Sequence, residues 1–216
     1  MTIRILAATM IACAPVVALA QQPKAATYIT DEEVKLINAS PGVDRQIVNV
    51  DIGKSNLAVG IIHRGKTGAP AAGAAAAAPA AAAAAADPCG VRAAAPPPAG
   101  TASGISHEGQ TETYIIVSGS GTLVTGGRIV NGRKSAPESS VTKVLNGPSC
   151  SGPIDGADVV KKVVKTGDII IIPAGVPHGW TDIADHVDYL SVRPDPPLSV
   201  RAESVLTLVV FPAEER

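Results

Sequence analysis

Residues 167–182 read Gly-Asp-Ile-Ile-Ile-Ile-Pro-Ala-Gly-Val-Pro-His-Gly-Trp-Thr-Asp, and the rest of the chain can be placed around them. Four consecutive isoleucines are β-branched and stiff, so they favour a strand that is buried on both faces. Pro173 and Pro177 cannot donate to a β-ladder and Gly175 can adopt a positive φ, so the chain must turn after this strand. The turn would present His178 rigidly at the mouth of a β-structure.

Period-2 alternation would place His178, Trp180 and Asp182 on one face of the next strand. A histidine mounted in this way suits a metal ligand or a general base. The alternative is a core histidine whose ring nitrogen bonds to a backbone carbonyl, and for an isolated strand histidine that alternative is the commoner one. The other titratable residues of the chain therefore decide how His178 is interpreted.

Short strands are predicted on both sides of this stretch. Thr30-Asp-Glu-Glu33 has the spacing of a capping box, so a short helix should run from Asp31 to about Asn38. Strand-like segments are Arg45–Asp51, Leu57–His63, Thr113–Val117, Thr122–Thr125, Val159–Lys165, Val187–Val192 and Ser204–Phe211, with Val141–Leu145 as a candidate short strand. Ser118-Gly-Ser-Gly121 should turn two of them into a hairpin. Many short strands between turns, with one minor helix, indicate an all-β sandwich or barrel.

Two segments differ in composition from this pattern. Residues 1–20 carry one basic residue, an apolar core and small residues before Gln21, which is typical of a cleavable signal peptide. The apolar run is shorter than the roughly 20 residues that a membrane span needs. Residues 66–103 are a low-complexity insertion rich in Ala, Pro and Gly, which we expect to remain unpacked. The sequence thus predicts an exported protein, periplasmic or secreted, with an N-terminal helix and first barrel strands in 21–65 and the remainder of the barrel in 104–216.

The charge and cysteine content limit the partners and the compartment. The net charge is −1 with no basic cluster and few aromatic residues, so neither nucleic acid nor, after signal cleavage, a membrane surface is an expected partner. Cys89 and Cys150 remain after signal cleavage, and both lie in Pro/Gly/Ser-rich contexts. An oxidising compartment favours a disulfide between them, and the alternative is two free surface thiols.

A second group of charged residues, at 105–119, precedes the predicted hairpin. Together with residues 167–178 it resembles the two sequence motifs of the cupin family. His107, Glu112 and Gly119 match the second half of the first motif, G-x5-H-x-H-x(3,4)-E-x6-G, and Gly167, Pro173, Gly175 and His178 match the second, G-x5-P-x-G-x2-H-x3-N, at every spacing. The resemblance covers roughly residues 45–194 without the insertion.

The resemblance implies a small all-β, double-stranded β-helix (jelly-roll) barrel that holds one divalent metal ion. The ligands carried over onto this chain are His107, Glu112 and His178. Two positions depart from the family motifs, since Ile105 stands where the first motif has another histidine, and Asp182 stands where the second motif has asparagine. Two imidazoles and one carboxylate still suit a first-row metal such as Fe, Mn, Zn, Ni or Cu, with open positions for water or substrate.

Other residues are candidate members of this site. His63 ends the strand that precedes the insertion, and it could lie beside Ile105 as an additional ligand or be a histidine at the barrel rim. Tyr114 and His63 are the candidate catalytic groups, because a phenol and an imidazole can transfer a proton to or from a bound substrate.

Strand parity identifies the side chains that would line the cavity. Tyr114 and Ile116 share the face of Glu112, and Trp180 shares the face of His178. The predicted pocket-lining residues are Ile105, Ile116, Trp180 and Asp182. Trp180 could instead fill the barrel core.

Two functions of different classes fit these observations. The first is a metal-dependent enzyme acting on a small polar organic molecule by oxygenase, lyase or isomerase chemistry. The alternative is a non-catalytic small-ligand-binding cupin whose metal site is degraded, because a fold does not fix its chemistry. The metal content of the purified protein separates them. Cupins commonly dimerise, so a homodimer is also considered, with the apolar strand Val205–Phe211 as a candidate interface.

Overall fold

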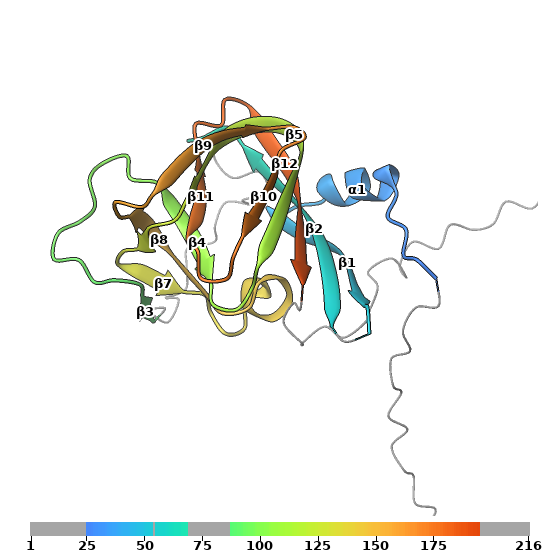
Figure 1. Ribbon diagram of the computed structural model, residues 1–216, viewed down its shortest axis with the longest axis horizontal. Helices are drawn as coiled ribbons and strands as arrows, with labels where there is room; N and C mark the ends of the chain where they lie inside the picture. The colour runs from blue at the N-terminus through green and yellow to red at the C-terminus, as the bar shows by residue number, and fades with distance from the viewer. Residues whose placement is uncertain (1–24, 54, 69–86, 195–216) are drawn as a thin grey trace, which may run out of the picture.

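A computed structural model describes residues 25–53, 55–68 and 87–194 (Figure 1). The predicted signal peptide, residues 69–86 of the insertion, and the strand predicted at Ser204–Phe211 with its candidate dimer interface lie outside the described residues. Within them the protein is a mostly antiparallel β-barrel with one short α-helix, as predicted. No helix in the described part of the chain is long and apolar enough to cross a membrane.

The described residues form one α-helix, one π-helical turn and twelve strands. They are α1 Asp31–Asn38, β1 Asp44–Asp51, β2 Asn56–Gly65, β3 Pro88–Cys89, β4 Ser103–His107, β5 Glu112–Thr125, β6 Arg128–Ile129, β7 Gly132–Lys134, η1 Val141–Leu145, β8 Ser149–Asp155, β9 Val160–Lys165, β10 Ile169–Ile172, β11 His178–Thr181 and β12 His186–Pro194. The predicted helix is confirmed together with its capping box, in which the Thr30 hydroxyl accepts from the Glu33 N–H and the Glu33 carboxylate accepts from the Thr30 N–H. Helix α1 lies outside the barrel, beside β1 and β2 (Figure 1).

Strand β5 is the longest element and joins the two halves of the barrel. Its first half pairs with β10 and β12, and its second half pairs with β9 and β11. The predicted hairpin at Ser118–Gly121 is therefore wrong. Gly119 has a φ of 70°, and a Cβ there would lie 2.0 Å from the His186 carbonyl oxygen. A register shift between Asp188 and Tyr189 of the partner strand bulges Val117, so the glycines bend the strand across the barrel instead of reversing it.

The barrel core consists of side chains on the inner faces of these strands. The main cluster contains Ile62, Tyr114, Ile116, Leu123, Val164, Ile172, Ile183, Val187 and Tyr189. The isoleucine strand β10 differs from the expectation of burial on both faces. Ile172 is buried, but Ile169 and Ile171 are 65% and 69% exposed, because alternate side chains of β10 point outward and this outer face meets solvent.

A second cluster involves the end of the low-complexity segment. Cys89 and Cys150, the predicted pair, are joined in a disulfide. Val91 bridges to Val130, and Ala102 is buried in the cluster. The expectation of an unpacked insertion is thus wrong for residues 87–103, because the disulfide and short backbone pairings attach this segment to the barrel.

The candidate strand Val141–Leu145 is instead the π-helical turn η1. The Thr142 hydroxyl lies within hydrogen-bonding distance of the Ala136 carbonyl and of the hydroxyl groups of Ser135 and Ser139. Such local side-chain bonds compete with a β-ladder for the backbone and favour a turn. This turn leads directly into the site described next.

Candidate metal centre

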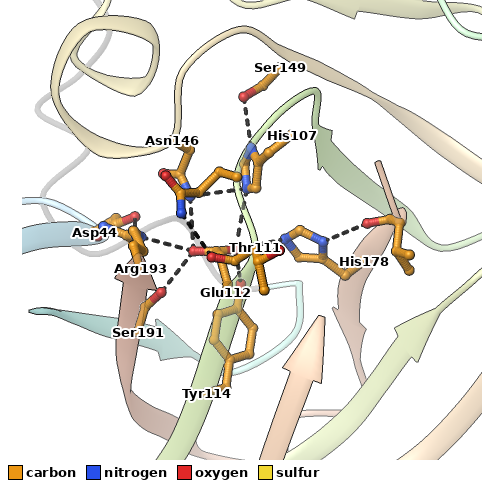
Figure 2. Close-up of polar contacts among 12 residues, drawn as sticks. Asp44, His107, Thr111, Glu112, Tyr114, Asn146, Ser149, His178, Ser191 and Arg193 are labelled. Carbon is orange, nitrogen blue, oxygen red and sulfur yellow. Dashed lines mark hydrogen bonds and ion pairs between the residues drawn. The ribbon is translucent and has the colours of Figure 1, made fainter. Parts of the chain in front are cut away.

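Three of the predicted site residues meet inside the barrel (Figure 2). His107 ends β4, Glu112 begins β5 and His178 begins β11, and all three side chains are buried. Glu112 Oε2 lies 3.3 Å from His107 Nε2 and 3.3 Å from His178 Nε2. Within residues 25–53, 55–68 and 87–194, these three form the one group of His, Cys, Asp or Glu side chains whose ligand atoms all lie within 4.8 Å of one another.

The turn between β10 and β11 fixes His178 relative to His107. Gly175 adopts the predicted positive φ, 79°, and its N–H donates to the His107 carbonyl oxygen at 2.7 Å. The Ala174 N–H lies 3.3 Å from the Thr111 hydroxyl, which precedes Glu112. The proline-rich turn is therefore bonded to the segment that carries the other two residues, and this explains how motifs far apart in the sequence converge.

The hydrogen bonds of both imidazoles determine their tautomers. The Ser149 hydroxyl donates to the Gly147 carbonyl at 2.8 Å, so it must accept from His107 Nδ1–H at 2.7 Å. His178 Nδ1–H donates to the Val176 carbonyl at 3.0 Å. Each Nε2 therefore carries a lone pair facing Glu112, and His178 Nε2 is buried without a hydrogen bond. Three acceptor atoms therefore converge on one point, and this chemistry fits a divalent metal.

The two oxygens of the Glu112 carboxylate have different surroundings. Oε1 accepts from Ser191 Oγ at 2.8 Å, Arg193 Nε at 3.0 Å and Asn146 Nδ2 at 2.9 Å. Oε2 accepts from the Tyr114 hydroxyl at 3.0 Å and faces the two imidazoles. Burial opposes ionisation, but the neighbouring His107 and His178 and the charge of Arg193 outweigh it and hold the pKa of Glu112 well below its usual range. Glu112 is thus an anion with one oxygen directed at the candidate metal position.

Arg193 connects this carboxylate to a second acid. The guanidinium is fully buried, and its Nη2 donates to Asp44 Oδ2 at 2.5 Å. Burial alone would lower the pKa of Arg193, but Asp44 and Glu112 reverse the effect and raise it. Desolvation raises the pKa of Asp44, against the effect of Arg193. The series Asp44–Arg193–Glu112, in which only Asp44 is partly exposed, therefore fixes the carboxylate from the side opposite the imidazoles.

Burial sets the protonation of the neighbouring His107 and Tyr114. Desolvation lowers the pKa of His107, which its contact with Glu112 offsets only in part, so the ring is neutral and its Nε2 is available. Desolvation and the Glu112 charge raise the pKa of the Tyr114 phenol well above its usual range. Tyr114, a predicted proton-transfer group, therefore lies in the site as a neutral O–H donor.

His63 is not brought to this group. It follows Ile62, which faces the core, so its own side chain points out of the barrel. There His63 Nδ1 lies 2.6 Å from Asp188 Oδ1 and borders an outer cavity of about 680 Å³ beside α1. Asp182 does not line the cavity as predicted either. Strand β11 ends at Thr181, and Asp182 is exposed with a φ of 52°.

The other predicted lining residues lie on the inner face. Ile105 pairs directly opposite His178, and Ile116 is buried in the core. Trp180 Nε1 donates to the Tyr189 hydroxyl at 3.2 Å, and the Tyr189 ring centroid lies 4.4 Å from that of Tyr114. Trp180 is therefore part of an aromatic layer packed beneath the site.

Sequence reasoning missed five polar members of the site, which are Asp44, Asn146, Ser149, Ser191 and Arg193. Strand parity could have found two of them, because Ser191 and Arg193 alternate with outward residues on the same face as the buried Tyr189. Asn146 carried no such signal, since the Asn-Gly pair in a polar segment is typical of a turn.

No protein-family model matches the sequence, and no curated protein does. Several solved structures are similar to it. An uncharacterized conserved protein with a double-stranded β-helix domain from Klebsiella pneumoniae is 15% identical, with 81% of this chain and 95% of that chain covered and a TM-score of 0.37. A cupin superfamily protein from Desulfitobacterium hafniense is 10% identical, with 82% and 99% covered and a TM-score of 0.34. Hydroquinone 1,2-dioxygenase from Sphingomonas sp. TTNP3 is 10% identical, with 82% and 85% covered and a TM-score of 0.37.

Identities and scores of this size carry no argument about activity. The conclusion on the fold and the site therefore rests on this chain alone. Its strands form the antiparallel sheet described above, and residues from both sequence motifs meet at one buried point. The chain has a cupin-like β-barrel with a buried His–Glu–His group that could hold a metal ion.

Proposed function

We propose that this protein is an exported, metal-dependent, cupin-type enzyme that acts on a small polar organic molecule. The observation that carries the proposal is the convergence of His107 Nε2, His178 Nε2 and Glu112 Oε2 with both imidazole tautomers fixed by other hydrogen bonds. A cation is the partner that this arrangement of acceptors lacks. The Cys89–Cys150 disulfide supports export, because such bonds persist in oxidising compartments.

The residues around the metal position would have different roles in catalysis. His107, His178 and Glu112 would hold a divalent ion, which would supply Lewis acidity or O₂ binding when present. Arg193 and Ser191 keep Glu112 ionised and oriented through Oε1. Tyr114 keeps its proton and would donate a hydrogen bond to an oxygen of a substrate bound beside Glu112, which would orient that substrate.

One observation favours the alternative of a non-catalytic binding protein. Ile105 stands on the inner face opposite His178 and offers no donor atom, so the predicted ligand set is one short. A degraded site would then leave the barrel to hold a small ligand without metal.

Elemental analysis of protein purified without chelators distinguishes the two functions. The proposal predicts one first-row metal ion per chain, or its uptake after reconstitution with Fe²⁺, Mn²⁺ or Zn²⁺, and its loss in His178→Ala. His186→Ala is the matched control, because that imidazole bonds to Ser118 and Asp185 outside the barrel. Wild-type protein that is folded but takes up no metal would support the binding protein.

A further inference from the structure

Asn146 is a buried amide in the candidate metal centre to which the sequence motifs assign nothing. It directly follows η1, and its backbone N–H donates to the Val141 carbonyl at 2.8 Å. The next residue, Gly147, has a φ of 73°, so the chain leaves the turn at once. The side chain is only 5% exposed and lies beside His107 and Glu112 (Figure 2).

The separations in the centre match those of ligands around a single ion. A metal–ligand distance of about 2.1 Å separates neighbouring ligand atoms by about 3.0 Å in octahedral geometry and about 3.4 Å in tetrahedral geometry. Glu112 Oε2 is 3.3 Å from each Nε2 atom. Asn146 Nδ2 is 3.2 Å from His107 Nε2, which is the same kind of spacing.

The orientation of the Asn146 amide must change when an ion is present. Its N–H₂ group now faces the His107 Nε2 lone pair, which is the lone pair that a metal ion would use. An N–H donor cannot remain directed at a cation. Turning the amide by 180° exchanges the nearly isosteric Nδ2 and Oδ1 and brings an oxygen to that position. The exchange turns the 2.9 Å contact of Asn146 with Glu112 Oε1 into a contact between two oxygens, whose repulsion the cation must offset, while Oε1 keeps the donors of Ser191 and Arg193.

We propose that Asn146 Oδ1 is the fourth protein ligand of the metal, replacing the donor that is missing at Ile105. This inference rests on the proposed metal function and specifies its ligand set. Position 105 lies on β4, whereas Asn146 reaches the same centre from the residue after η1, so the missing ligand would be replaced from a different part of the fold. A neutral amide oxygen is a hard ligand, and with a carboxylate it favours Mn²⁺ or Fe²⁺ over the softer Cu⁺.

Substitutions at position 146 separate a ligand from a hydrogen-bond donor that only positions Glu112. Mn²⁺ affinity is measured on metal-free protein by competition with a chromophoric chelator. Asn146→Ala should weaken binding by at least 10–100-fold, the loss typical even of supporting residues. Asn146→Asp keeps an oxygen donor and should bind at least as tightly as wild type. If Asn146 only positions Glu112 through a hydrogen bond, Asn146→Asp should bind Mn²⁺ more weakly than Asn146→Ala does. The new carboxylate would then repel Glu112 Oε1 across about the present 2.9 Å with no metal bond in compensation.

A rescue experiment provides the second readout. Adding Ile105→His to Asn146→Ala should restore Mn²⁺ affinity by returning a fourth ligand from β4, and the visible spectrum of the Co²⁺-loaded protein should change between wild type and Asn146→Ala. Unchanged affinity and spectrum in folded Asn146→Ala, or Asn146→Asp binding more weakly than Asn146→Ala, would overturn this proposal and leave the three-ligand metal site standing. Failure of wild type to bind Mn²⁺, Co²⁺ or Zn²⁺ would overturn the proposed function as well.

Discussion

Glu112 shows how one side chain can be fixed on one side and available on the other. Three donors occupy Oε1, from β12 and from the residue after η1, while Oε2 faces two imidazole lone pairs. A carboxylate that is oriented in advance loses little freedom when it binds an ion, and this is how surrounding residues strengthen a metal site. The buried arginine is the strongest of these supports, because it carries a full charge.

Arg193→Met should destabilise the protein by about 3–5 kcal/mol, because it leaves the buried Glu112 and the partly buried Asp44 without their cation. Urea unfolding measures the loss. Arg128→Met is the matched control, since Arg128 is exposed on β6 and its replacement should change stability by less than about 0.5 kcal/mol. A loss below about 1 kcal/mol for Arg193→Met would show that the buried charge series does not stabilise the fold.

Asp188, on the outer face of the barrel, should make the free energy of unfolding depend on pH. Burial raises its pKa, but hydrogen bonds from Ser118 and His63 outweigh that effect and bring the pKa below its usual value of 3.8. A lowered pKa in the folded state means that the stabilisation is present above about pH 4 and is lost as the pH falls through the folded-state pKa. Arg45 and His186 border the same outer cavity.

The change that tests this is Asp188→Asn, with urea unfolding followed from pH 7 to pH 2.5. The free energy of unfolding of wild type should exceed that of the variant by roughly 1–3 kcal/mol at pH 7, and this difference should become smaller below about pH 4. A gap that stays constant to pH 2.5 would mean that the Asp188 carboxylate is not the stabilising form.

At the scale of the element, the glycines of β5 decide how the barrel closes. Gly119→Ala would bring a methyl group to 2.0 Å from the His186 carbonyl at a φ of 70°, so it should cost more than about 2 kcal/mol. Gly65→Ala in β2 is the control, because nothing lies within 4 Å of the added atom. Thermal unfolding followed by circular dichroism gives both values. Equal melting temperatures for the two variants would show that β5 does not need the bend at Gly119.

The elements also show which parts of the fold could be predicted. Local sequence patterns predicted the structure correctly where a pattern has one interpretation, as in the Thr30 capping box and the Gly175 turn. They failed where two interpretations share one pattern. Ser118-Gly-Ser-Gly121 suits a reversal or a bend, and only the pairing of β5 with four other strands selects the bend. The exposure of Ile171 likewise depends on the outer face of β10 being uncovered in the fold, which its sequence does not encode locally.

The whole molecule brings together the parts of the site that the sequence separates. The resemblance to the cupin motifs implied that His107, Glu112 and His178 would converge, and each of them lies at a strand end next to a turn. Asn146 and Asp44 could not be predicted, since their places depend on how η1 and β1 pack against the end of the barrel. The sequence left two places open for His63, in the site or at the barrel rim, because proximity along the chain does not state which face of the sheet a side chain occupies.

The most direct test of the metal centre is the anomalous diffraction of crystals loaded with one equivalent of Zn²⁺. The account predicts one peak inside the barrel at about 2.0–2.2 Å from His107 Nε2, His178 Nε2 and Glu112 Oε2. A peak at any other place, or no peak in well-diffracting crystals with these side chains in their present positions, would contradict the claim that this His–Glu–His group binds a divalent metal.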